Sequence, residues 1–176
     1  MASEAVTKKT KQFLKLYGND IAKALSGTPI FLATAVGQKC NESGYGTSPL
    51  AVKYNNFGGI RGLPREAMGK TSNGWAIFKT PQDCFRAYAR FITELPQYTQ
   101  ALKATSPEQQ ILGLVNSGYC KIGWQVIGGK RVYFSDKDYL AICQGAVDVS
   151  RNLVPGGRVT SVNLSSSLGN IQTNTL

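Results

Sequence analysis

The chain has 176 residues, 42% of them hydrophobic and 10% aromatic, which is enough apolar material for one globular domain with a single core. No apolar run approaches the roughly 18 residues that a membrane-spanning helix needs, so membrane insertion is excluded. The formal net charge of +10 predicts attraction to polyanions such as nucleic acid, anionic membranes or acidic wall polymers. Because the basic residues are spread along the chain, charge alone selects none of these partners.

A helix is predicted over about 4–17, ended by a Gly-Asn pair and followed by a short helical piece at 20–25. A Thr-Pro start and an apolar 3.6-residue period predict a buried helix over 28–42, which two glycines then stop. From 54 to 78, glycines and asparagines flank short apolar pieces, which predicts loops and short strands. The Asn-Gly pair at 73–74 is a hairpin turn signal.

Two Ser/Thr-Pro starts predict further helices over 80–95 and 106–116. The segment 118–134 alternates in places around a Gly-Gly pair, which predicts a second hairpin, and a last helix is expected over 135–153. The polar tail, 154–176, is expected to be a linker, a mobile end, or a docking segment that becomes a strand on a partner. The predicted fold class is α+β, mainly α: a helical body at 1–153 with small β insertions.

The side chains available for chemistry are restricted. The chain has no histidine, and Cys40, Cys84, Cys120 and Cys143 form no C-x-x-C pair, so neither a metal site nor a cofactor is expected. The missing histidine also excludes Ser-His-Asp and Cys-His nucleophiles. Four cysteines allow two disulfides in an oxidising compartment, with buried thiols as the alternative. Polar catalysis must therefore rest mainly on carboxylates, tyrosines and amides.

Glu42 is the carboxylate that the sequence singles out. It ends the apolar helix and is followed at once by Ser-Gly-Tyr-Gly, where the backbone must turn tightly. Burial and the helix C-terminus both disfavour an anion, so we expect this site to favour the protonated acid. A protonated carboxyl group facing a groove is what cleavage of a glycosidic bond requires. The alternative is a solvated glutamate of no consequence.

The segment "NESGYGTSPLAVKYNNFGGIRG" resembles the signature of glycoside hydrolase family 73, the bacterial cell-wall N-acetylglucosaminidases. Two later segments, "FKTPQDCFRAYARFI" and "YFSDKDY", are also similar to family motifs, and the matches follow the family's order over about 5–153. The residues that match in the first segment are Glu42, Ser43, Gly44, Gly46, Ser48, Ala51, Asn55, Asn56, Phe57, Gly59 and Ile60.

The resemblance implies a lysozyme-like helical body with a small β lobe beside a groove for a glycan strand, and Glu42 as general acid. In the family a second carboxylate lies in the β lobe, where Glu66 is the only acidic residue between Glu42 and Asp83. Glu66 is therefore the candidate for base or nucleophile, although the adjacent Arg65 offers it a purely structural partner. Asp83 is sufficiently explained as a helix-capping residue.

The family can also use the N-acetyl group of the substrate as nucleophile, with a tyrosine supporting the charged intermediate. Tyr133 best matches that tyrosine, and Tyr119 competes with it because the segment between them looks inserted relative to the family pattern. For substrate binding, amides can bond sugar hydroxyl and acetamido groups and aromatic rings can stack on pyranoses, with turn and core roles as alternatives. These candidates are Tyr45, Tyr54, Asn55, Asn56, Phe57, Trp75 and Tyr119.

The expected function is hydrolysis of the glycan strand of peptidoglycan by an endo-β-N-acetylglucosaminidase. A muramidase or lytic transglycosylase on the same scaffold, a non-catalytic wall-binding module and a nucleic-acid binder are the alternatives; the last rests on charge alone and is not favoured. The first residues lack a signal-peptide core. We therefore expect synthesis in the cytoplasm and delivery to the periplasm or wall by a phage or a secretion machine, with delivery machinery or an immunity protein as further partners.

Overall fold

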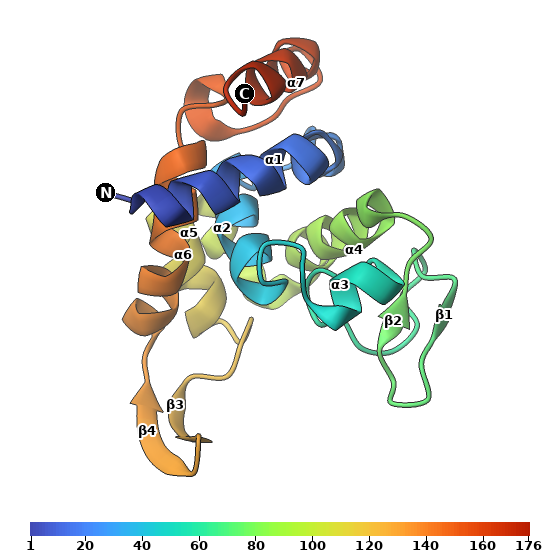
Figure 1. The fold of residues 1–176 in the computed structure, drawn as a ribbon, viewed down its shortest axis with the longest axis vertical. Coiled ribbons are helices and arrows are strands. Elements are labelled where there is room, and N and C mark those ends of the chain that lie inside the picture. The colour runs from blue at the N-terminus through green and yellow to red at the C-terminus, as the bar shows by residue number, and fades with distance from the viewer.

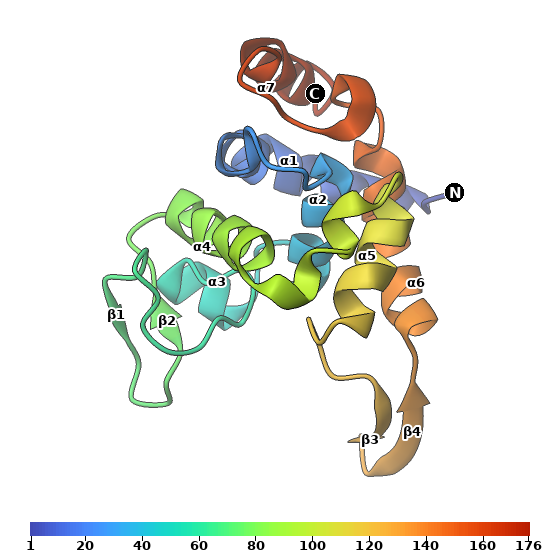
Figure 2. The same ribbon diagram turned by 180° about the vertical axis from the view of Figure 1, so that it is seen from behind.

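The computed structural model describes residues 1–176 as seven α-helices, three short 3₁₀ helices and two separate two-stranded antiparallel sheets (Figures 1 and 2). The helices pack around a shared core, and both hairpins lie at its margin. In chain order the elements are α1 (Glu4–Leu25), α2 (Leu32–Glu42), α3 (Pro49–Tyr54), β1 (Gly69–Lys70), β2 (Ala76–Ile77), α4 (Pro81–Glu94), η1 (Pro96–Tyr98), η2 (Ala101–Lys103), α5 (Pro107–Asn116), β3 (Gly123–Ile127), β4 (Lys130–Phe134), α6 (Asp136–Ser150), η3 (Pro155–Gly157) and α7 (Leu164–Thr173).

Helix α2 is the buried centre of the molecule, and all its residues from Leu32 to Cys40 are buried. Small residues let its neighbours approach closely: a Cβ atom added at Gly37 would lie 2.8 Å from a methyl carbon of Val147 on α6. The predicted start of this helix at residue 28 is wrong. The chain is still extended at Phe31, whose N–H donates to the buried Gln110 side chain (2.9 Å), so the helix begins only at Leu32.

Helix α1 is continuous, so the predicted break at Gly18 is wrong. Gly18 is buried where α7 crosses α1, and an added Cβ atom would lie 2.7 Å from Ile171. The glycine therefore serves close approach between helices, and its cost in helix propensity is offset by packing.

The C-terminal segment differs from every secondary structure predicted for it, because it forms helix α7. Leu164, Leu168 and Ile171 follow a helical period and pack against the main core, and Figure 1 shows α7 lying along α1. Arg158, between η3 and α7, holds this segment against the start of α2: its side chain donates to the carbonyl of Pro29 (3.0 Å) and stacks on the ring of Phe31. The apolar period was masked by the many Ser, Thr and Asn residues between these positions.

Both predicted hairpins are confirmed. Gly74, at φ +86°, donates to the Thr71 carbonyl (2.9 Å) in the β1–β2 turn, and Gly128 and Gly129 form the β3–β4 turn at positive φ. The predicted helix caps are also present at Thr80, Ser106 and Ser135. Helix α6 ends at Ser150, slightly before the predicted end at 153.

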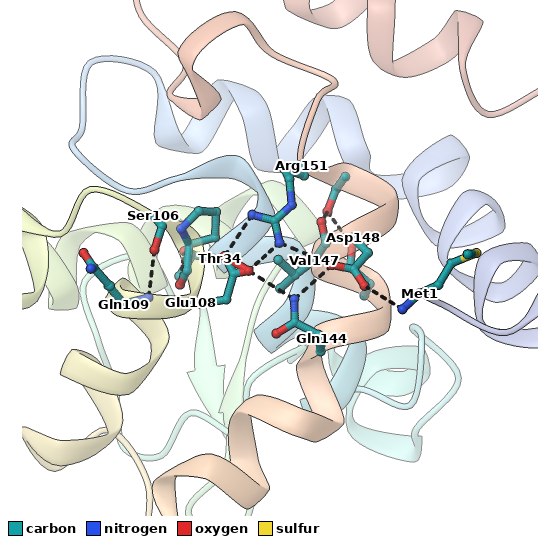
Figure 3. A network of polar contacts seen from close by, with 12 residues as sticks. Met1, Thr34, Ser106, Glu108, Gln109, Gln144, Val147, Asp148 and Arg151 are labelled. Atoms are coloured by element: carbon teal, nitrogen blue, oxygen red, sulfur yellow. Dashed lines mark hydrogen bonds and ion pairs between the residues drawn. The ribbon is translucent and has the colours of Figure 1, made fainter.

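An ionic network joins α5 to the C-terminal end of α6 (Figure 3). The guanidinium of Arg151 pairs with Glu108 in the first turn of α5 and with Asp148 one turn back on α6. Gln144 donates to both carboxylates, at 3.2 and 2.9 Å. These bonds lower the pKa of Glu108 to about 2, mainly through Arg151. The network fixes α6, whose other end carries a residue of the site described below.

All four cysteines are free thiols, and Cys40, Cys84 and Cys143 are buried. This is the buried-thiol alternative left open by the sequence. No group of three or more His, Cys, Asp or Glu side chains is arranged to hold a metal ion, and none of the helices has the length and apolarity to cross a membrane.

Candidate active site

An open groove of about 490 Å³ lies where α2 ends, between the β1–β2 lobe and the start of the segment that leads into β3. Its lining is rich in aromatic and aliphatic side chains, and Glu42 is the only acidic residue in it. The lining residues are Lys39, Glu42, Gly58, Ile60, Arg61, Tyr88, Phe91, Ile92, Leu95, Tyr98, Tyr119, Cys120 and Tyr139.

The turn after α2 presents Glu42 to this groove. The hydroxyl of Ser43 donates to the Lys39 carbonyl (2.5 Å) and accepts from the Gly46 N–H (2.9 Å), which fixes the reversal of the chain. Gly46 has φ +83°, and an added Cβ atom there would lie 2.8 Å from Tyr17. The glycine is therefore required both for the backbone conformation and for packing, as the tight turn in the sequence predicted.

Lys39, one turn before Glu42 on α2, is a buried cation in the site. Its Nζ lies 2.9 Å from Glu42 Oε2, and the side chains of Lys39 and Glu42 are only 2% and 16% exposed. The ammonium also donates to the Tyr119 hydroxyl (3.2 Å) and lies 3.9 Å from the centroid of the Tyr88 ring. Burial and the helix end, which the sequence indicated, are therefore not the only influences on Glu42, because Lys39 lies against one of its oxygens.

The opposite wall approaches the ion pair through Gly58. A Cβ atom at this position would lie 2.7 Å from Lys39 Nζ and 3.2 Å from Glu42 Oε2. No side chain fits at residue 58 unless the ion pair moves. The loop backbone is therefore part of the site, and its lack of a side chain keeps the carboxylate accessible.

Three tyrosines surround the carboxylate. Tyr139, in the first turn of α6, donates from its hydroxyl to Glu42 Oε1 at 3.1 Å, so each oxygen of Glu42 has a donor. Burial, followed by the charge of Glu42, raises the pKa of Tyr88 and Tyr119 well above the ordinary value, and it raises the pKa of Tyr139 in the same way. All three phenols therefore stay protonated and can act as hydrogen-bond donors.

Glu66 does not line the groove. It forms a two-pronged hydrogen bond with Arg90 of α4, at 2.8 and 2.9 Å from Nε, and its side chain is 5% exposed. Burial raises the pKa of Glu66, but the hydrogen bonds and charge of Arg90 outweigh this, so the pKa lies below its ordinary value. With both oxygens held by Arg90, Glu66 has the environment of a structural ion pair.

The two candidate tyrosines are placed differently. Tyr119 lines the groove and contacts Lys39, whereas Tyr133 lies on β4, exposed, with its ring against Trp124. Tyr45 lines a separate basic groove beside Lys9 of α1. Of these three residues, the structure brings only Tyr119 to Glu42.

The two asparagines hold the β lobe together through their amides. Asn55 adopts φ +52° at the end of α3 and donates to the carbonyls of Phe78 and Lys79, both at 3.1 Å. Asn56 is buried, donates to the carbonyls of Ile60 (2.9 Å) and Ala76 (3.0 Å), and accepts from the Ile60 N–H. Their amide donors are used by the backbone, which supports the turn role, and a sugar contact of either residue stays a prediction.

The aromatic candidates next to them are mostly structural. Phe57 is buried in the core, where its ring contacts Tyr17 and Phe85, so a stacking role for Phe57 is wrong. Tyr54 is half-buried at the end of α3 and does not line the groove. Trp75 is also half-buried, and its ring stacks on the guanidinium of Arg61, 3.9 Å away, which does line the groove. Trp75 therefore supports the groove wall through Arg61.

Sequence reasoning missed Lys39, Tyr88 and Tyr139. Lys39 carried a usable signal, because a lysine three residues before a glutamate on an otherwise apolar helix places both on one face. Tyr139 belongs to the "YFSDKDY" segment that carried the family resemblance, but its distance of 97 positions from Glu42 hid the contact. Tyr88 lies in the family-like segment "FKTPQDCFRAYARFI", but its period was that of a core residue.

A mainly helical body and a small β lobe flank a groove that holds one largely buried carboxylate, an arrangement of the lysozyme-like fold class. The family model described as mannosyl-glycoprotein endo-beta-N-acetylglucosaminidase matches residues 18–148, so the chain belongs to the Glucosaminidase family. This confirms the family and the glycoside hydrolase class that the sequence predicted.

Two solved structures are similar to the chain. The catalytic domain of the autolysin Auto from Listeria monocytogenes has a TM-score of 0.60 and 14% identity, and the match covers 95% of this chain and 90% of that one. A type VI secretion system effector–immunity complex from Pseudomonas protegens includes a chain with a TM-score of 0.51 and 19% identity, with 80% and 93% covered. No curated protein matches the sequence. These similarities confirm the predicted fold.

Proposed function

We propose that the protein is a peptidoglycan hydrolase, an endo-β-N-acetylglucosaminidase with Glu42 as its general acid. The observation that carries this proposal is the position of Glu42 as the only acidic residue in an aromatic groove, at the helix end that bears the family motif. Family membership supports the reaction class, and the similarity to an autolysin domain supports the wall glycan as substrate.

The presence of one carboxylate in the groove favours a substrate-assisted mechanism. Inverting and ordinary retaining enzymes need a second carboxylate about 6.5–9.5 Å or about 5 Å away, and the groove offers none. The acetamido oxygen of the substrate attacks the anomeric carbon while Glu42 protonates the leaving oxygen. Glu42 then takes a proton from the water that opens the cyclic intermediate, which restores the acid.

Lys39 and Tyr139 have complementary roles in this proposal. When Glu42 gives up its proton, the ammonium of Lys39 stabilises the carboxylate that forms, from 2.9 Å. The Tyr139 hydroxyl holds the other oxygen and fixes the orientation of the carboxyl group. Preorganised donors aimed at developing charge are a principal source of catalysis in enclosed sites. The hydroxyl of Tyr119 is the phenol best placed to support the charged intermediate.

The bond that is cut is tested by digesting purified peptidoglycan, reducing the fragments and identifying their ends by mass spectrometry. The proposal predicts N-acetylglucosaminitol ends. Muramitol ends would identify a muramidase and 1,6-anhydro ends a lytic transglycosylase, and either would overturn the proposed bond while keeping the fold. Binding to peptidoglycan without cleavage would indicate a wall-binding module.

The proposed place of action is the periplasm or cell wall, reached through a phage or a secretion machine. The similarity to a chain of a type VI secretion system effector–immunity complex supports this route, and by analogy a protective partner in the producing cell. Expression in a bacterial host should cause lysis only when an export signal is added, and Glu42→Gln should abolish that lysis. Equal lysis with and without export would contradict the proposed place of action.

A further inference from the structure

The β3–β4 hairpin exposes large apolar side chains: Trp124 is 59%, Val126 75% and Tyr133 56% exposed. Its strands pair with each other and with no other strand, and Figures 1 and 2 show them extending away from the helices. A contiguous exposed apolar surface on a soluble domain indicates a binding site. The catalytic groove described above leaves this surface unused.

Strand register collects these side chains on one face. Trp124 is the cross-strand partner of Tyr133, and Val126 is the partner of Arg131, so all four project to the same side. The rings of Trp124 and Tyr133 lie 5.4 Å apart, and the guanidinium of Arg131 lies 4.8 Å from the Trp124 ring centroid. We call Trp124, Val126, Arg131 and Tyr133 the aromatic face; Ile127 and its partner Lys130 lie on the other side of the ribbon.

The hairpin begins and ends at the catalytic groove. Tyr119 and Cys120, which line the groove, lie just before β3, and Ser135 after β4 caps the helix that carries Tyr139. At the base, Ile122 and Phe134 pack against the small core cluster between α5 and α6. The base is therefore held by the body, while the outer part of the hairpin lies on the side away from the β1–β2 lobe (Figure 1).

We propose that the aromatic face binds the glycan strand of peptidoglycan beyond the catalytic groove; the identity of this polymer rests on the proposed function. Rings of this kind offer an amphipathic surface on which a pyranose can stack. Arg131 can pair with the carboxylates of the peptide side chains, and residues 121–134 contain three cations and no acidic residue. Continuity with the groove favours the substrate polymer over an acidic protein or a membrane.

The test is co-sedimentation with purified peptidoglycan sacculi, with every variant made in a Glu42→Gln background so that binding is measured without cleavage. Trp124→Ala with Arg131→Ala should bind at least about tenfold more weakly. Ile127→Ala with Lys130→Ala is the matched control, because it removes one apolar group and one charge from the opposite face, and it should bind like the parent. With Glu42 intact, the first pair should still cut a short soluble N-acetylglucosamine oligomer at the parent rate.

Unchanged binding of the aromatic-face variant, or an equal loss in both pairs, would overturn the proposal. Loss of binding to phosphatidylglycerol vesicles with retained binding to sacculi would also overturn it, and would indicate a membrane surface instead. The proposed function fails separately. If the wild type does not cut peptidoglycan but the aromatic-face variant still loses binding to sacculi, the binding proposal stands and the catalytic one does not.

Discussion

Glu42 occupies a position that is electrostatically unfavourable for an anion, since the carboxyl end of α2 carries partial negative charge. Two hydrogen-bond donors offset this unfavourable position: Lys39 donates to one oxygen of the Glu42 carboxylate and Tyr139 donates to the other. A carboxyl group with two fixed donors has a defined orientation before substrate arrives. The proposed catalytic unit is therefore the Lys39–Glu42–Tyr139 cluster and not the glutamate alone.

Replacing Lys39 tests this view. In Lys39→Met we expect kcat to fall by about 100-fold, the cost of a misplaced catalytic group, while KM changes little because Lys39 lies beneath the carboxylate and is almost fully buried. Steady-state kinetics on a soluble N-acetylglucosamine oligomer provide the measurement, and circular dichroism controls for folding. A rise in KM at constant kcat would instead make Lys39 a substrate-binding residue.

Gly58→Ala tests the same cluster from the opposite wall. The new methyl group would lie 2.7 Å from Lys39 Nζ and 3.2 Å from Glu42 Oε2, so the ends of both flexible side chains must shift. We expect a fall in kcat of about 10–100-fold with an unchanged melting temperature. The control is Gly69→Ala, because a Cβ atom at residue 69 would meet no atom within 4 Å. Gly59→Ala is less suitable, since the positive φ of Gly59 would strain any other residue. Equal activity of both variants would mean that the ion pair can move freely.

At the scale of elements, the ionic network of α5 and α6 supports the helix that delivers Tyr139. Glu108 has a depressed pKa of about 2 in the folded protein, so its contribution to the free energy of unfolding is full above its ordinary value of 4.5 and disappears as pH falls through 2. The partly exposed Arg151 is screened by solvent, which reduces that contribution.

Glu108→Gln should therefore lower the free energy of unfolding by about 1–2 kcal/mol at pH 7, after allowance for screening, and by only a small fraction of that at pH 2. Urea denaturation of both proteins across this pH range measures the difference. Glu4→Gln, at an exposed position in the first turn of α1, is the control. A difference that persists at pH 2 would show that the effect does not depend on the charge of Glu108.

Most elements with local start signals were predictable from the sequence, although the Thr-Pro pair at 28–29 lies ahead of the actual start of α2 at Leu32. Thr80, Ser106 and Ser135 each cap a helix, and both glycine-containing turns form hairpins, because these signals act within four residues. Gly18 led to a wrong helix end, because the contact that explains this glycine is made by α7, at the far end of the sequence. Helix α7 was not predicted, because its three core-facing positions, Leu164, Leu168 and Ile171, are separated by many polar residues. In each case a long-range contact decided what the local pattern left open.

The site was predictable to a similar degree. Glu42 was accessible to sequence reasoning through its local context and the family motif, and Tyr119 was a candidate as well. Tyr139 was missed, because it comes from a distant segment that only the fold brings to Glu42. Asn56 and Phe57 belong to the same motif and turned out to serve the β lobe and the core. A family motif thus marks the residues that build a site as well as those that act in it.

For the whole molecule, the arrangement is a helical body whose groove at Glu42 has a short lobe on one side, and the body also carries an exposed hairpin (Figure 1). The net charge of +10 suits an anionic wall polymer, and the proposed glycan contacts extend from the groove to the hairpin. The structure offers the reaction a single groove carboxylate. Whether Glu66 is needed besides Glu42 therefore decides between the proposed mechanism and one with two carboxylates.

That choice is tested most directly by the release of soluble fragments from purified peptidoglycan by the wild type, Glu42→Gln and Glu66→Gln, each checked for folding by circular dichroism. Glutamine keeps the shape of each side chain and removes the transferable proton. The account predicts that Glu42→Gln is inactive and that Glu66→Gln, which retains a hydrogen-bonding partner for Arg90, keeps most of its activity. An active Glu42→Gln, or a folded but inactive Glu66→Gln, would contradict it.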